Sequence, residues 1–264
     1  MPTIRIDDRD DPRVTHYMNI RERELVGREN RFIAEGKVVL NVLFSAKRFE
    51  AQSVLVLESR LPGLQETLKH APEDMPVYVA SQDVLDSIAG FHIHRGILAT
   101  GKRRGSETAE SLLENLPENA LVVALVGISN HDNMGSIFRN AAAFGADLVL
   151  MDETSCDPLY RKAIRVSVGA TLKVPFAFAG NAMSLAQSLD RHGFQQLALS
   201  PSGAADIRDI KRPKRLALYL GTEGEGLPAD LLSRLNTARI SIASDFDSLN
   251  VAAASAIALH QFSK

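Results

Sequence analysis

The sequence has little cysteine, no long apolar run and no excess of charge of either sign. Its one cysteine, Cys156, excludes an internal disulfide framework. No apolar run approaches the roughly 18 residues that span a bilayer. The first 14 residues include four aspartates and no apolar stretch, which excludes a signal peptide. The seven histidines lack metal-ligand spacing, so we expect no metal. These absences favour a cytoplasmic globular protein without a membrane partner.

The overall charge gives no cue for nucleic acid. The sequence contains 30 Lys and Arg residues and 32 Asp and Glu residues, which gives a net charge of −2. The isoelectric point is near 6.4. A strongly basic domain, with an isoelectric point above about 9, would be the simple indication of a nucleic-acid binder. A hydrophobic content of 45% is too high for a disordered chain. Any nucleic-acid contact must therefore come from local basic patches and shape.

The alternation of short strands and helices indicates an α/β protein of two domains. The polar stretch 101–108 contains two glycines and marks a boundary, which gives domains of residues 1–105 and 106–264. In the first domain we expect strands at 53–58, 76–80 and 96–100 and helices at 61–70 and 82–88. In the second we expect strands at 121–126, 147–151, 173–178, 195–199, 216–220 and 239–242 and helices at 133–144, 157–168, 181–192, 228–235 and 249–262. Strands separated by helices favour mostly parallel sheets.

Three segments that follow predicted strands carry the residues best suited to chemistry. Residues 130–139 (NHDNMGSIFR) open a helix, whose N-terminus attracts anions, and Arg139 adds a planar cation. Residues 220–227 (LGTEGEGL) have glycines spaced as GxxGxG, which is neither a dinucleotide fingerprint nor a P-loop. Residues 248–254 (SLNVAAA) offer Ser248 as a helix N-cap and the donor and acceptor amide of Asn250. Each segment alone is equally consistent with a capped helix or an ordinary glycine turn.

Together, and in this order, the segments NHDNMGSIFRNAAAFGAD, LYLGTEGEGLP and SLNVAAASAIALH resemble the SpoU (TrmH-like) RNA methyltransferases of the SPOUT superfamily. The resemblance implies a C-terminal SPOUT α/β-knot, which is a trefoil-knotted and mostly parallel sheet, and a homodimer formed through this domain. Residues 31–36 (RFIAEG) and 94–99 (HRGILA) are similar to the L30e-like substrate-binding domain of the family. Residues 1–20 have no counterpart in it.

The resemblance also implies an activity, a cofactor and a site. The activity is transfer of a methyl group from S-adenosylmethionine to a ribose 2′-hydroxyl of tRNA or rRNA. The implied catalytic residues are Arg139, Asn133, Glu223, Ser248 and Asn250. The implied cofactor-binding residues are Leu199, Ser200, Gly221, Thr222, Gly226, Ile242 and Leu249. An arginine keeps its proton, so we expect Arg139 to stabilise the forming alkoxide and to hold the neighbouring phosphate.

The RNA contacts are the least specific part of this interpretation. We expect them at Arg31, Arg139, Arg161 and Arg165. An RNA base methyltransferase of the same fold and a non-catalytic RNA-binding protein remain open alternatives. A nucleotide-dependent oxidoreductase is disfavoured, because residues 127–135 lack its glycine fingerprint. The choice between tRNA and rRNA, and the nucleotide modified, also remain open.

Overall fold

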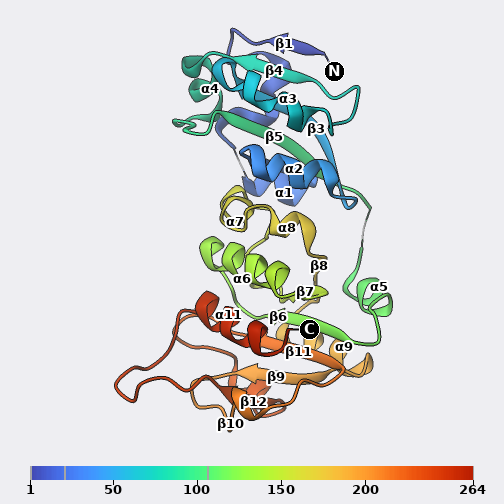
Figure 1. The fold of residues 1–264 in the computed structure, drawn as a ribbon, viewed down its shortest axis with the longest axis vertical. Helices are drawn as coiled ribbons and strands as arrows, with labels where there is room; N and C mark the ends of the chain where they lie inside the picture. Colours follow the sequence, from blue (N-terminus) through green and yellow to red (C-terminus); the bar gives the residue numbers. More distant parts are fainter. Residues whose placement is uncertain (1, 21, 106, 264) are drawn as a thin grey trace. The chain divides into compact units, whose positions relative to one another are not determined.

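The computed structural model describes residues 2–20, 22–105 and 107–263, which form two compact units (Figure 1). The first unit comprises Met1–Gly105 with Asp157–Lys173, and the second comprises Ser106–Cys156 with Val174–Lys264. The segment Asp157–Lys173 thus packs with the N-terminal part, although the division expected from the sequence places it in the C-terminal domain. No helix within the described residues is long and apolar enough to cross a membrane.

The first unit is a five-stranded mixed sheet with short helices. The strand order is β1-β4-β3-β5-β2. The strands are β1 (Thr3–Arg5), β2 (Arg31–Glu35), β3 (Phe49–Leu57), β4 (Val77–Ala80) and β5 (Ile97–Arg103). The helices are α1 (Glu22–Glu29), α2 (Lys37–Ser45), α3 (Gln65–Leu68), α4 (Gln82–Ala89), α7 (Arg161–Val166) and α8 (Ala170–Lys173), with 3-10 turns at Pro12–Ile20, Glu58–Arg60 and Pro62–Leu64. Strand β5 runs antiparallel to both β3 and β2.

The second unit is a seven-stranded, fully parallel sheet in the order β10-β12-β9-β11-β6-β7-β8. Its strands are β6 (Ala120–Leu125), β7 (Leu148–Met151), β8 (Phe176–Phe178), β9 (Gln195–Leu199), β10 (Ala205–Asp206), β11 (Arg215–Leu220) and β12 (Asn236–Arg239). Its helices are α5 (Ala109–Glu114), α6 (His131–Ala143), α9 (Ala182–Arg191), α10 (Ala229–Leu232) and α11 (Val251–Gln261), with a 3-10 turn at Ile207–Asp209. The mixed α/β class with parallel strands confirms the expected fold class.

The central strands of the second unit explain why their sequences are apolar throughout. Every residue of β6 is buried. Val122 and Ala124 join a core cluster with Leu113 of α5 and Leu185 of α9. The intervening residues, such as Val123, are equally buried and face the other side, because successive side chains of a strand alternate. A parallel sheet covered on both faces requires such a continuous apolar run.

Several expected elements of the first unit differ in the structure. Its sheet is mixed rather than mostly parallel, because β5 reverses direction and pairs antiparallel with two neighbours. The helix expected at 61–70 is divided into a 3-10 turn, Pro62–Leu64, and α3. The helix expected at 157–168 begins only at Arg161. Asp157 instead closes a turn, since its carboxylate accepts a hydrogen bond from the Leu159 amide at 2.8 Å. Residues 3–5, which the sequence left unassigned, pair with β4 as an edge strand.

Two strands of the second unit are also displaced from the expected positions. The strand expected at 239–242 lies earlier, at β12, because its pairing with β9 ends at Ala238. The strand expected at 173–178 is shortened to β8, since Lys173 belongs to helix α8. The trefoil knot and the L30e-like character of the first unit stay predictions from the family resemblance.

Candidate active site

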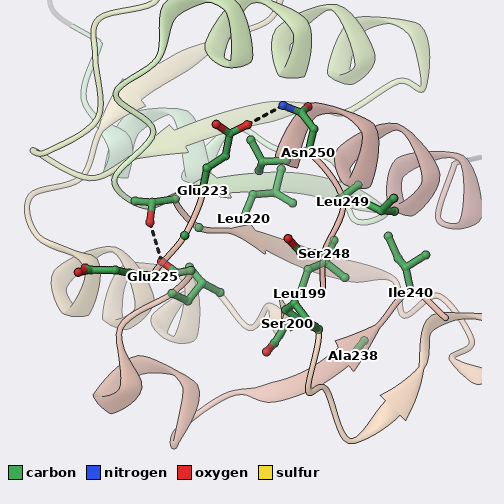
Figure 2. A pocket seen from close by; sticks show the side chains of 18 of the residues that line it. Leu199, Ser200, Leu220, Glu223, Glu225, Ala238, Ile240, Ser248, Leu249 and Asn250 are labelled. Atoms are coloured by element: carbon green, nitrogen blue, oxygen red, sulfur yellow. Dashed lines mark hydrogen bonds between the residues drawn. The ribbon is translucent and has the colours of Figure 1, made fainter. Parts of the chain in front are cut away.

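The loops after strands β9, β11 and β12 enclose a pocket of about 420 Å3 at the carboxyl edge of the second sheet (Figure 2). Ligands of open α/β sheets bind at this edge. The walls come from residues 199–201 and 220–227 and from parts of the segment 238–254, together with Leu232 of α10. All seven residues expected to bind the cofactor line it, namely Leu199, Ser200, Gly221, Thr222, Gly226, Ile242 and Leu249. Their role there stays a prediction.

The glycine loop approaches itself so closely that it tolerates no side chain at its start. A Cβ atom added to Gly221 would lie 2.5 Å from the carbonyl carbon of Gly226. The Thr222 amide donates to the Gly226 carbonyl at 3.2 Å and closes the turn. Gly224 and Gly226 have positive φ angles, 96° and 74°, which favour glycine. The GxxGxG spacing is therefore explained by a compact turn that presents its backbone to the pocket.

Three of the expected catalytic residues meet at the edge of this pocket, which Glu223 and Asn250 line and Asn133 does not. Glu223 accepts hydrogen bonds at Oε1 from Nδ2 of Asn133 at 2.9 Å and from Nδ2 of Asn250 at 2.5 Å. Nδ2 of Asn250 also donates to Oδ1 of Asn133 at 3.2 Å. In Figure 2 the Glu223 side chain points toward Asn250, while Glu225 points away from it. We call Asn133, Glu223 and Asn250 the amide–carboxylate cluster.

The orientation of the Asn250 amide is fixed by its second function as a helix cap. Its Oδ1 accepts hydrogen bonds from the backbone amides of Ala252 and Ala253, at 2.9 and 3.3 Å, so its NH2 group must face the cluster. The sequence predicted Ser248 as this cap, and that prediction is wrong: the helix begins at Val251, with Asn250 as N-cap. Ser248 instead lines the pocket.

Helices α6 and α11 hold the cluster from both sides. Asn130 caps α6, since its Oδ1 accepts from the Asp132 amide at 2.8 Å. Further along α6, Nδ2 of Asn140 donates to the Ala252 carbonyl and to Oγ of Ser255, both at 2.9 Å. These hydrogen bonds from Asn140 join the helix that carries Asn133 to the helix that Asn250 caps.

A buried aspartate supports the loop that leads into α6. Asp152 is 3% exposed. Its Oδ1 accepts from the Gly127 amide at 2.9 Å and from Oγ of Ser155 at 2.7 Å, and Ser155 Oγ in turn accepts from the Ile128 amide at 3.0 Å. A Cβ atom on Gly127 would lie 2.5 Å from Cγ2 of Thr222, so this loop packs directly on the glycine loop. Sequence reasoning missed Asp152, because the Gly127 amide that it holds lies 25 residues earlier in the chain.

Arg139 does not join the cluster. It lies on an exposed face of α6, does not line the pocket, and makes no hydrogen bond or ion pair within the part of the chain that the structure describes. It follows Asn133 by six residues, about 9 Å along the helix axis and on a different face. Its guanidinium is therefore available to a group outside the pocket.

The model of the SpoU rRNA methylase family matches residues 120–260, which include the glycine loop, both capped helices and the amide–carboxylate cluster. This chain belongs to the SpoU rRNA methylase family. A tRNA/rRNA methyltransferase of Mycobacterium bovis is 36% identical over 265 residues, which cover 96% of this chain and 89% of the relative. A 23S rRNA (guanosine-2′-O-)-methyltransferase of Neisseria meningitidis is 29% identical over 60% of this chain and 64% of that protein.

Solved structures share the fold along nearly the whole chain. The rRNA methyltransferase of Sinorhizobium meliloti, solved with bound AdoMet, superposes with a TM-score of 0.81 at 23% identity and covers 98% of this chain and 97% of its own. A structure described as an RNA 2′-O ribose methyltransferase gives a TM-score of 0.79 at 24% identity, with 98% and 97% covered. These likenesses establish the fold of this SpoU family member.

The arginines expected to bind RNA in the first unit are already engaged with other side chains. Arg31 donates to Glu29 and to Gln52, both at 2.8 Å. Arg161 donates to Oε2 of Glu35 at 2.9 Å and lies over the Phe91 ring at 4.4 Å. Arg165 lies 3.9 Å from the same carboxylate, whose side chain is 5% exposed. RNA binding by these arginines stays a prediction.

Proposed function

We propose that this SpoU family member transfers a methyl group from S-adenosylmethionine to a ribose 2′-hydroxyl of RNA. The observation that carries the proposal is the amide–carboxylate cluster at the edge of a glycine-walled pocket. The names of the Neisseria relative and of the 2′-O ribose methyltransferase structure support the ribose as the acceptor over a base. The cluster argues against a non-catalytic RNA-binding protein, because all of its members and Arg139 are retained.

The residues of the pocket fit S-adenosylmethionine. A volume of about 420 Å3 falls within the range of about 300–1,000 Å3 for small-molecule sites. Aliphatic side chains, among them Leu199, Ile240 and Leu249, would contact the adenosine, and the backbone of the glycine loop would meet its polar groups. Glu223 and Glu225 suit a cationic ligand and would repel a phosphate. When bound, the cofactor supplies an electrophilic methyl group on a positively charged sulfur.

The chain itself contributes mainly orientation. Asn133 and Asn250 fix one oxygen of Glu223, and its second oxygen has no partner among the described residues. Glu223 therefore presents a held acceptor toward the edge of the pocket, where it can align a hydroxyl for transfer. Holding the reacting atoms in line is a large part of catalysis in such transfers. Arg139, which lies on an exposed face of α6 and does not line the pocket, would hold a phosphate of the bound RNA through its planar pair of donors.

The substrate we propose is a structured tRNA or rRNA. The M. bovis relative, which matches over most of both chains, carries a name that includes both classes. Arg139 on α6, and Arg31 and Arg165 in the first unit, would contact the phosphate backbone. Because the net charge is −2, we expect binding through a few such contacts. Affinity should then fall with salt in proportion to the number of phosphates neutralised.

We further propose that the protein acts as a homodimer through the second unit. Ile257 of α11 and Phe246 in the segment before it are large apolar side chains that do not line the pocket and remain 43% and 71% exposed. A second copy seated over them would remove this surface from water. Light scattering coupled to size exclusion tests this directly: a mass near 58 kDa, twice the 28.8 kDa of one chain, is expected, and a mass of one chain contradicts it.

The proposal is tested by methyl incorporation from tritiated S-adenosylmethionine into total RNA. We expect incorporation with the wild type and a loss of at least about tenfold for Glu223→Ala, which removes the shared acceptor of the cluster. Glu118→Gln is the matched control, because Glu118 is an exposed carboxylate that pairs with Lys214 and does not line the pocket. Binding of RNA without incorporation would favour a non-catalytic role, and incorporation into bases would favour a base methyltransferase.

A further inference from the structure

One wall of the pocket is formed by an extended segment whose side chains alternate between the pocket and the opposite side. Ile240 and Ile242 line the pocket, whereas Ser241 between them does not. This alternation is that of extended backbone. The Ser241 hydroxyl instead donates a hydrogen bond to Oδ2 of Asp206, at the end of the edge strand β10. The wall is thus tied to a residue 35 positions earlier in the chain.

The carboxylate of Asp206, which accepts the hydrogen bond from Ser241, is held in place by further contacts. Its side chain is 8% exposed. Oδ1 accepts from the backbone amide and from Nε of Arg208, both at 2.9 Å, and Oδ2 accepts from Nη2 of Arg208 at 2.8 Å. This two-pronged bond from the Arg208 guanidinium holds the pKa of the Asp206 carboxyl far below its usual range. The carboxylate therefore stays charged and cannot rotate away from Ser241.

A reciprocal set of bonds joins the same two segments from the other direction. Nη1 of Arg239 donates to the carbonyls of Gly203 and Ala204, at 2.8 and 3.1 Å. Gly203 packs so closely that an added Cβ atom would lie 2.2 Å from the carbonyl carbon of Ala238. The segments 199–206 and 236–242, which together form this wall, are thus held together by the Arg239 side chain, by the close packing of Gly203 on Ala238 and by the backbone hydrogen bond from the Ser200 amide to the Ala238 carbonyl at 2.9 Å.

We infer that Asp206 and Ser241 are positioning residues that set the affinity for the cofactor. This inference rests on the proposed function. Neither side chain lines the pocket, so both act through Ile240 and Ile242. A wall already held in its binding conformation loses little conformational freedom when the ligand binds, whereas an untied wall must be ordered at that moment. Loss of the tie should weaken cofactor binding and leave the transfer step at saturation unchanged.

Three variants test this role. Ser241→Ala removes the donor, Ser241→Thr keeps a hydroxyl at the same place, and Ser87→Ala is the matched control. Ser87 lies in the first unit and its hydroxyl donates to the Val84 carbonyl at 2.7 Å, remote in the chain from every pocket segment. Calorimetric titration gives the dissociation constants of S-adenosylmethionine and S-adenosylhomocysteine. Hydrogen exchange of the ligand-free protein, followed in peptides covering 238–250, reports the wall itself.

We expect Ser241→Ala to weaken binding of both ligands about tenfold, as loss of a hydrogen bond to a charged group predicts. Exchange at 238–250 should accelerate, and kcat at saturating cofactor should stay within about twofold, so that the effect falls on KM. Ser241→Thr should bind both ligands nearly as tightly as the wild type, because it keeps the hydroxyl. Ser87→Ala should bind them as the wild type does. Equal binding by Ser241→Ala and the wild type, or a fall in kcat without a change in KM, overturns the positioning role alone. If the wild type binds neither ligand, the proposed function fails and the positioning role with it.

Discussion

The oxygen and the NH2 group of the Asn250 side chain have different functions, and substitutions can remove one function without the other. Its oxygen caps α11 through the amides of Ala252 and Ala253. Its NH2 group donates to Glu223 and Asn133. Serine is about as good an N-cap as asparagine but has no NH2 group, separate from the capping oxygen, that could reach Glu223 and Asn133. Asn250→Ser should therefore keep the helix and lose the cluster.

The magnitudes follow from these contacts. An intact cap keeps the free energy of unfolding within a few tenths of a kcal/mol, which shifts the melting temperature by less than about 2 °C in a chain of this size. Loss of the donor that holds Glu223 should lower kcat about 10- to 100-fold, since a misplacement of about 1 Å at a reacting group costs about that much. Asn250→Asp keeps the cap but sets a second carboxylate against Glu223. Repulsion of about 1–4 kcal/mol is expected at about 4 Å, so its activity should be lower still.

The assay pairs thermal unfolding, followed by circular dichroism, with methyl transfer at saturating RNA and cofactor. Asn250→Ala is the comparison, because it loses both functions and should be less stable by about 1 kcal/mol and as inactive as Asn250→Ser. The reasoning is refuted if Asn250→Ser retains full activity. It is equally refuted if Asn250→Ser and Asn250→Ala lose the same amount of stability, because the cap would then not depend on the side-chain oxygen.

Three further predictions concern single side chains. Arg161→Ala should leave the buried Glu35 carboxylate without its 2.9 Å partner and destabilise the protein by about 3 kcal/mol, measured by urea unfolding; a change below about 0.5 kcal/mol would contradict a structural role. Gly221→Ala should abolish cofactor binding in calorimetry while the circular dichroism spectrum stays native, because the added methyl meets Gly226 at 2.5 Å; unchanged binding would show that the loop can open. Arg139→Lys should lower methyl transfer at least about tenfold with cofactor affinity unchanged, and full activity would exclude a two-pronged contact to RNA.

Local sequence signals predicted an element correctly where its type and bounds depend on residues within that same segment. The apolar strand β6 and the helix α4 agree with the predictions to within one residue, and helix α6 begins two residues before its expected start, because their signals lie within a few residues. Two of the three motifs, residues 220–227 and 248–254, line the pocket, whereas residues 130–139 do not. The loop after β9 was expected to bind the cofactor only from the family resemblance. All seven expected cofactor-binding residues line it, since the carboxyl ends of parallel strands meet at one edge.

The sequence did not predict features that depend on contacts between residues far apart in the chain. Both Ser248 and Asn250 are suitable N-caps for α11. Asn250 takes this position because its NH2 group also donates to Glu223 and Asn133, which leaves its oxygen facing the first amides of the helix. Asp206 and Ser241 carry no local signal, since each is an ordinary polar residue until β10 and the wall segment come together. The direction of β5 is set by its pairing with β3, and helices between strands do not reveal that reversal.

The central claim is that the methyl group goes to a ribose, and tandem mass spectrometry of nucleosides tests it most directly. RNA methylated by the purified protein with S-adenosylmethionine carrying a deuterated methyl group is digested to nucleosides, and each labelled nucleoside is fragmented at its glycosidic bond. The account predicts that the label stays with the ribose fragment and that the base ion is unlabelled. A labelled base ion, or RNA without label, would contradict it.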